Sequence, residues 1–189
     1  MDSGVGAMEE YLAGLCALVA LGTLLSSGAR HLSSLARLVD AIRAHGVLPS
    51  RGAESVAMGL GLLEVVTAVA GLVTATPVFS RPELARISLV VAGALFGAFC
   101  LYSWVALRRA PDAPCGCSRD EHPSTIWVPI RGGSLAIIAL AAVALIEEPI
   151  LGQASDVHSL LTLVGAVAVG MLLWSLPAAM VIPRQEELA

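Results

Sequence analysis

Charged residues are scarce in this 189-residue chain, and lysine is absent altogether. Only 14% of the residues are charged, 57% are hydrophobic, and the mean hydropathy is +0.82. Because a soluble domain of this composition would expose far too much apolar surface, we predict a membrane protein. The 15 acids outnumber the 11 bases, all of them arginine, and leave a net charge of −4. Binding to phosphates needs a basic face, so this balance argues against nucleic acid as a partner.

Cysteine is too sparse for a disulfide scaffold. Of the four cysteines, Cys16 and Cys100 fall within apolar segments, where we expect them to be small core residues. Only Cys115 and Cys117 lie in a polar segment. A basic region is also missing at the N-terminus, where acids precede the first apolar run, so we expect no removable secretory signal.

Long apolar runs take up most of the chain. A membrane-spanning helix needs about 20 apolar residues. Segments that meet this condition are 11–29, 55–76, 87–107, 126–146 and 159–182, the last kinked or ended by Pro177. We therefore predict an all-α integral membrane protein, a bundle of four to five transmembrane helices, with residues 1–189 forming one domain in contact with the lipid bilayer.

Residues 31–48 have a different pattern from the spans. Apolar residues recur there at helical spacing and charged residues mark the opposite side. The apolar positions are Leu32, Leu35, Val39 and Ile42, and the charged ones are Arg37, Asp40 and Arg43. This pattern predicts an amphipathic helix that lies on the membrane surface and is ended by Gly46 and Pro49.

A single acid, Glu64, lies near the middle of the second span. A carboxylate at this depth is protonated, paired, or turned toward a wet interior, because exposure to lipid costs too much free energy. We expect Glu64 to face the inside of the bundle. A functional role and a structural hydrogen bond between helices both remain open for it.

The polar loop between the third and fourth spans contains Cys115-Gly116-Cys117. Two thiols separated by one flexible glycine can close on each other in a strained, readily exchanged disulfide. Nearby cations favour the thiolate by lowering the thiol pKa from its reference value of about 8.5. Arg119 lies in the loop, and Arg131 is close enough to the start of the fourth span to reach back toward it. We therefore favour a thiol–disulfide redox pair.

Metal binding is the rival chemistry for this loop. Cys115, Cys117 and His122 offer two sulfurs and an imidazole, with Asp120 or Glu121 nearby. Zinc would take four ligands and copper(I) fewer. Two incidental thiols are a third interpretation. In a fourth, the chain is a non-enzymatic membrane subunit or small-solute carrier that uses Glu64, so whether it is an enzyme stays open.

The arrangement of these motifs resembles the methylamine utilisation protein MauE family, within the wider group of DoxX-like membrane proteins. Three features carry the resemblance, which covers about residues 21–146. They are His45-Gly46-Val47-Leu48-Pro49 after the first span, Leu63-Glu64 in the second, and Pro114-Cys115-Gly116-Cys117 followed by Arg131 at the start of the next.

The resemblance implies a role in methylamine metabolism, in the plasma membrane of a bacterium. Family members are associated with maturation of the disulfide-rich small subunit of methylamine dehydrogenase, an exported enzyme, alongside a thioredoxin-like protein. Carried over to this chain, Cys115 and Cys117 would be the redox pair. The resemblance names no cofactor.

Arginine is distributed unevenly between the two sides that five spans define. Nine arginines fall on the side of the cysteine loop, namely Arg30, Arg37, Arg43, Arg51, Arg108, Arg109, Arg119, Arg131 and Arg184. Only Arg81 and Arg86 fall on the other side. The positive-inside rule therefore predicts a cytoplasmic cysteine loop. Disulfide donation to an exported protein would instead require the loop to lie outside.

Overall fold

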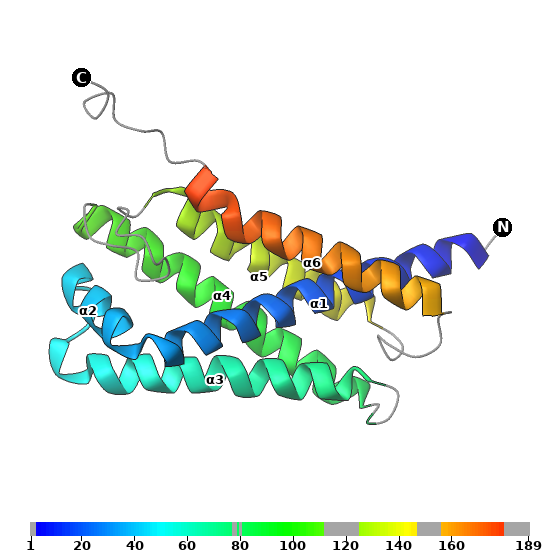
Figure 1. The fold of residues 1–189 in the computed structure, drawn as a ribbon, viewed down its shortest axis with the longest axis horizontal. Helices are drawn as coiled ribbons and strands as arrows, with labels where there is room; N and C mark the ends of the chain where they lie inside the picture. Colours follow the sequence, from blue (N-terminus) through cyan, green and yellow to red (C-terminus); the bar gives the residue numbers. More distant parts are fainter. Residues whose placement is uncertain (1–2, 77–78, 80, 112–124, 147–155, 180–189) are drawn as a thin grey trace, which may run out of the picture.

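The computed structural model describes residues 3–76, 79, 81–111, 125–146 and 156–179, and this part of the chain is helical with no strand (Figure 1). The helices are α1 (Ser3–Ser33), α2 (Leu35–His45), the short 3-10 helix η1 (Ser50–Gly52), α3 (Ala53–Thr74), α4 (Pro82–Arg109), α5 (Trp127–Leu145) and α6 (Asp156–Ala179). The predicted all-α bundle is confirmed.

Four of the expected spans correspond to helices long and apolar enough to cross a membrane, namely α1, α3, α4 and α5. The fifth corresponds to α6, whose apolar stretch with described side chains, Ser159–Ser175, is shorter than the other four. Helix α6 continues past Pro177 to Ala179, so this proline does not end the helix. The last residues of the predicted fifth span lie outside the described residues.

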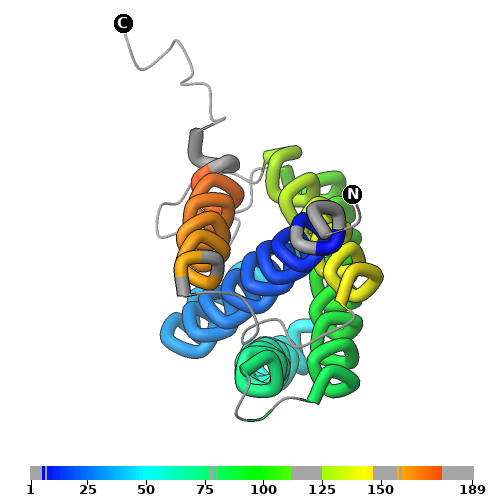
Figure 2. Tube along the Cα trace, turned by 90° about the vertical axis from the view of Figure 1, so that its right-hand side faces the viewer, coloured from blue at the N-terminus to red at the C-terminus, as the bar shows by residue number. Residues whose placement is uncertain are grey.

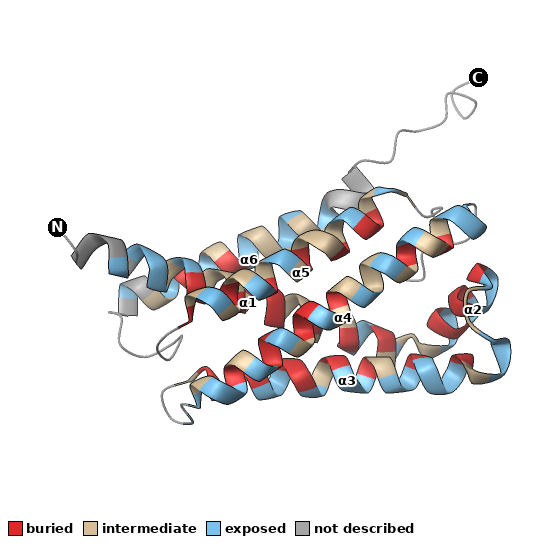
Figure 3. Cartoon of the chain, turned by 180° about the vertical axis from the view of Figure 1, so that it is seen from behind, coloured by how far each residue is buried: buried red, intermediate tan, exposed pale blue. Residues whose placement is uncertain are grey.

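Helix α1 is the centre of the bundle. It contacts each of the other α-helices described, and in Figure 2 it crosses diagonally between α3, α4, α5 and α6. Its small and branched apolar residues, such as Ala17, Ala20 and Leu24, are fully buried there. The outward faces of the surrounding helices carry exposed apolar side chains such as Val66 and Leu172, as expected for surfaces in contact with lipid (Figure 3).

Glycines bring α1 and α3 close together. A Cβ atom added at Gly28 of α1 would lie 2.9 Å from the Cβ of Glu64, and one at Gly61 of α3 would lie 2.9 Å from Leu32. Such distances mean that the two backbones approach each other as closely as glycine allows. This contact brings the end of α1 to the middle of α3, where Glu64 lies.

Helix α2 corresponds to the predicted amphipathic helix, with one correction. It begins at Leu35, because α1 continues through His31 to Ser33 before the chain turns at Ser34. Its apolar face, which includes Val39 and Ile42, packs with Ala53 and Ala57 of α3. The bundle itself therefore buries this apolar face.

Consecutive long helices run in opposite directions, so one end of the bundle collects the end of α1, all of α2, the start of α3, the end of α4 and the start of α5 (Figure 1). We call it the arginine-rich end, because seven of the nine arginines in the described residues belong to these segments or to η1, just before α3. They are Arg30, Arg37, Arg43, Arg51, Arg108, Arg109 and Arg131. The other two, Arg81 and Arg86, lie at the opposite end, before and within the first turns of α4.

Candidate functional site

A buried pair of His31 and Glu64 lies where α1 crosses α3. The His31 Nδ1 and Glu64 Oε2 atoms are 2.7 Å apart, and the two residues are only 6% and 7% exposed. The Ser27 hydroxyl donates a hydrogen bond of 3.3 Å to Glu64 Oε1. Both carboxylate oxygens therefore have partners from α1. The expectation that Glu64 faces the inside of the bundle is confirmed.

The contact gives both ionisable side chains a polar partner inside the bundle, away from lipid. The pair therefore meets the condition under which an ionisable group is tolerated inside a membrane protein. Gly28 is necessary for the contact, because any side chain at this position would collide with Glu64.

A polar cavity of about 130 Å³ opens on one side of the pair, between α1, α2, α4, α5 and α6. Three arginines line it: Arg30, Arg37 and Arg131. Hydroxyl groups also line the cavity, from Thr23, Ser27, Ser33 and Ser34. Most of its polar lining residues belong to the arginine-rich end.

Trp174 of α6 forms part of the wall of this polar cavity. The guanidinium carbon of Arg30 lies 4.3 Å from the centre of the Trp174 ring, and that of Arg131 lies 5.3 Å from it. One aromatic ring therefore holds two guanidinium groups, from α1 and α5, by cation–π contacts. Arg131 is half-buried and lies about 6 Å along the helix axis from Trp127, the first residue of α5.

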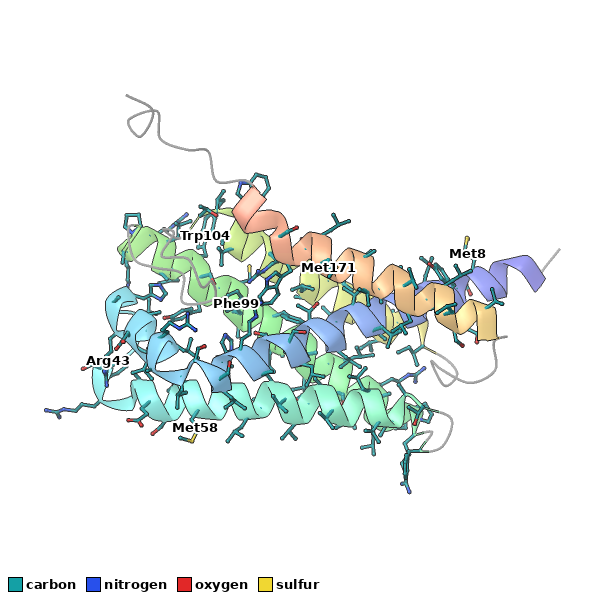
Figure 4. The ribbon with its side chains drawn as sticks, viewed as in Figure 1. Met8, Arg43, Met58, Phe99, Trp104 and Met171 are labelled. Carbon is teal, nitrogen blue, oxygen red and sulfur yellow. The ribbon has the colours of Figure 1, made fainter. Side chains whose placement is uncertain are left out.

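An apolar cavity of about 190 Å³ also adjoins the pair, between α2, α3 and α4. Residues that line both cavities are His31, Leu38, Glu64, Leu95 and Phe99. Figure 4 labels Phe99 in the space between α4 and α1. At the edge of the apolar cavity, His45 Nδ1 and the Tyr102 hydroxyl are 2.8 Å apart and join α2 to α4.

Cys115, Cys117 and His122 lie outside the described residues, so neither the redox pair nor the metal alternative is tested here. Within the described ranges, no group of three or more His, Cys, Asp or Glu side chains could hold a metal ion. The other two cysteines, Cys16 and Cys100, are both half-buried and not in a disulfide. Of the proposed site residues, Glu64 and Arg131 are described, and both line the polar cavity.

Sequence reasoning missed His31, Arg30 and Trp174. It assigned His31 to a surface helix. A buried acid in the next span needs a polar partner on a neighbouring helix, however, and the end of α1 could supply one. That requirement, together with the few histidines in the chain, was the available signal. No comparable signal pointed to Trp174, because it lies on α6, far along the chain from both arginines.

Comparison with known proteins gives one family. Residues 8–146 match the family described as methylamine utilisation protein MauE. The match covers α1 from Met8 onward and all of α2 to α5. It begins earlier than the resemblance noted in the sequence, and contains Glu64, both loop cysteines and Arg131. Neither the curated proteins nor the solved structures give a match.

Proposed function

Because the chain belongs to the MauE family of membrane proteins, we propose that it is a thiol–disulfide redox or maturation factor of the bacterial plasma membrane. Its client would be an exported protein, such as the small subunit of methylamine dehydrogenase. One observation carries the proposal. Helix α4 ends and α5 begins at the arginine-rich end. Cys115 and Cys117, the two cysteines that lie in a polar stretch of the sequence, belong to the segment that connects these helices.

Chain length keeps this pair near the arginine-rich end. Cys115 follows Arg109 by six residues, and an extended chain covers at most about 3.6 Å per residue, or about 22 Å in all. Arg108 and Arg109 end α4, and Arg131 lies in the first turns of α5. Cations at both ends of the connecting segment favour the thiolate form, which is the nucleophile in disulfide exchange.

The proposed reaction is exchange with a thioredoxin-like protein. A thiolate of the Cys115/Cys117 dithiol attacks the partner's disulfide, forms a mixed disulfide and releases one partner thiol. The second cysteine then attacks the mixed disulfide, which leaves a Cys115–Cys117 disulfide and a fully reduced partner. Two electrons and two protons pass to the partner. The reverse reaction, from a partner dithiol, restores the Cys115/Cys117 dithiol.

The experiment uses the full-length chain with Cys16→Ala and Cys100→Ala, so that only the loop thiols remain. Membranes are incubated with reduced or oxidised thioredoxin, and free thiols are counted by the gel shift of a maleimide-linked polymer. We expect the loop thiols to follow the redox state of thioredoxin. We also expect Cys115→Ser or Cys117→Ser to trap a mixed disulfide. The proposal would be contradicted if the redox state of the loop thiols did not change with that of thioredoxin and neither variant formed a mixed disulfide.

Glu64 supports a second candidate, a membrane carrier for a small solute. The buried His31–Glu64 pair lines both the polar and the apolar cavity, as expected for a group that exchanges a proton or ligand inside a bundle. A carrier would keep its activity in Cys115→Ser/Cys117→Ser and lose it in Glu64→Gln. The redox factor would lose its activity in the double cysteine variant.

A further inference from the structure

The described lining of the polar cavity carries an excess of positive charge. Arg30, Arg37 and Arg131 line it, and Glu64 is the single acid among the described residues around it. The Glu64 carboxylate is already engaged by His31 and Ser27. At most one negative charge from these residues therefore faces three guanidinium groups around a small space.

None of these three arginines has a carboxylate partner among the residues that the structure describes. The two ion pairs found there join His31 to Glu64 and Arg43 to Asp40. Arg37 donates a hydrogen bond of 2.6 Å to the Ser34 hydroxyl, and the other two guanidinium groups lie against the ring of Trp174. A ring and a hydroxyl group orient a guanidinium but do not neutralise its charge, and most of its five donors have no acceptor among the described residues.

The geometry points to an anion as the missing partner. Guanidinium groups match the paired oxygens of carboxylates and phosphates and form short, charge-assisted hydrogen bonds with them. Trp174 holds two of the guanidinium groups in place beforehand, which lowers the entropy lost on binding. Ser34 also lines the cavity, and its hydroxyl, which accepts the hydrogen bond from Arg37, can donate its own proton to an anion. A cavity volume of about 10–15 Å³ is enough for one water molecule. The volume of this cavity, about 130 Å³, is therefore large enough for an oxyanion group.

We propose that the polar cavity binds an oxyanion group, a phosphate or a carboxylate, through Arg30, Arg131 and Arg37. The group is either a free anion or the headgroup of an anionic lipid, since the cavity belongs to the end of the bundle that faces a membrane surface. This site does not depend on the loop cysteines, so it stands or falls separately from the proposed redox function.

The test uses Trp174 as its own reporter. Trp104→Phe and Trp127→Phe remove the other two tryptophans from the full-length chain, which is purified in a non-ionic detergent or placed in phosphatidylcholine nanodiscs. One arm titrates inorganic phosphate and sodium acetate. The other replaces part of the phosphatidylcholine with phosphatidylglycerol. We expect a saturable change in Trp174 fluorescence. A response to the soluble anions identifies a free ligand, and a response to phosphatidylglycerol alone identifies a lipid.

Variants at the cavity distinguish this site from general attraction of anions. Arg30→Gln and Arg131→Gln should each weaken binding about tenfold or more, as expected for the loss of one charge-assisted hydrogen bond. The matched control is Arg43→Gln, which is exposed at the same arginine-rich end, as Arg30 is, but lies outside the cavity (Figure 4). It should leave affinity unchanged. If a variant misfolds by circular dichroism, the anion-dependent rise in the unfolding midpoint of the wild-type chain gives a second measurement. No response to either probe, or equal losses in all three variants, would overturn the proposal.

Discussion

At the scale of single residues, the most consequential contact is between His31 and Glu64. Removing one member of a buried pair leaves an uncompensated polar or charged group, which is costlier than losing a surface contact. Glu64 has two partners on α1, His31 and Ser27, and all three lie close to the Gly28 crossing. The pair therefore ties α1 to α3 at their crossing.

We predict that Glu64→Ala lowers the free energy of unfolding by about 3–5 kcal/mol, because it leaves His31 buried without its partner. Glu64→Gln should cost less, about 1–3 kcal/mol, because the amide keeps a hydrogen bond while losing the titratable proton. It should keep the fold and alter function. Unfolding in mixed micelles, followed by circular dichroism, measures the stability of both variants.

Glu54→Gln is the matched control, since this acid is exposed in the first turn of the same helix. A double-mutant cycle with His31→Ala should give a coupling energy of about 0.5–3 kcal/mol between positions 31 and 64. Additive effects would show that the two side chains do not stabilise each other. A Glu64→Gln variant indistinguishable from wild type in stability and function would leave Glu64 without either role.

Arg131 carries a separate prediction, which rests on the proposed redox function. Replacing it with glutamine removes a cation near the start of α5, so the pKa of the reactive loop thiol should rise toward the free-thiol value. The measurement is the alkylation rate against pH in the chain that keeps only Cys115 and Cys117. Arg51→Gln serves as the control, because Arg51 is exposed at η1 before α3. An unchanged rate profile in Arg131→Gln would remove this role of the arginine.

The candidate site was only partly predictable from the sequence, and the reason is physical. Glu64 stood out because one acid in a long apolar run has to face inward. Its partner did not stand out, since His31 adjoins an amphipathic pattern that also suits a surface helix. Arg30 and Trp174 come together only through the packing of α1 against α6. Nothing in local sequence encodes that packing.

At the scale of helices, the close crossing of α1 and α3 depends on glycines, which have no side chain, at positions 28 and 61. We predict that Gly28→Ala lowers the free energy of unfolding by about 1–3 kcal/mol, because the new Cβ would lie 2.9 Å from both Glu64 and Val65. Unfolding in mixed micelles measures this loss of stability. Gly28→Ala should also disturb the His31–Glu64 contact at the same crossing.

Gly22 provides the control within the same helix. A Cβ added there meets nothing within 4 Å. Gly22→Ala should therefore be neutral or stabilise the protein by up to about 1 kcal/mol, because alanine favours helix over glycine. Equal effects at Gly22 and Gly28 would mean that helix propensity, and not the crossing, determines the result.

The positions of the helices were largely predictable from the sequence. Long apolar runs fix where α3, α4 and α5 lie, because a span needs a set length of apolar residues. The boundary between α1 and α2 was harder to predict from the sequence. No proline or glycine separates His31 from Leu35, and the turn at Ser34 follows from the packing of α2 onto α3.

At the scale of the whole molecule, the two ends of the bundle differ strongly in charge. The arginine-rich end holds seven of the nine described arginines. By the positive-inside rule we predict that this end, and with it the loop of Cys115 and Cys117, faces the cytoplasm. A cytoplasmic pair fits the delivery of electrons toward an exported client, whereas an external pair would fit the donation of a disulfide.

A membrane-impermeant maleimide tests this orientation in intact cells that express the chain with only the two loop cysteines. We expect no labelling until the cells are permeabilised. Phe79→Cys, in a chain without other cysteines, is the control for the opposite end, because Phe79 is exposed between α3 and α4. It should react at once. Prompt labelling of the loop thiols after mild reduction, with Phe79→Cys protected, would reverse the orientation.

The central place of α1 bears on how the protein is made. Because synthesis runs from the N-terminus, α1 is made before any of the helices that it contacts. The partner of His31, Glu64, becomes available with α3, and Trp174, which packs against Arg30, only with α6. The His31–Glu64 contact can therefore form early in translation, whereas the cavity wall around the arginines needs the last helix described.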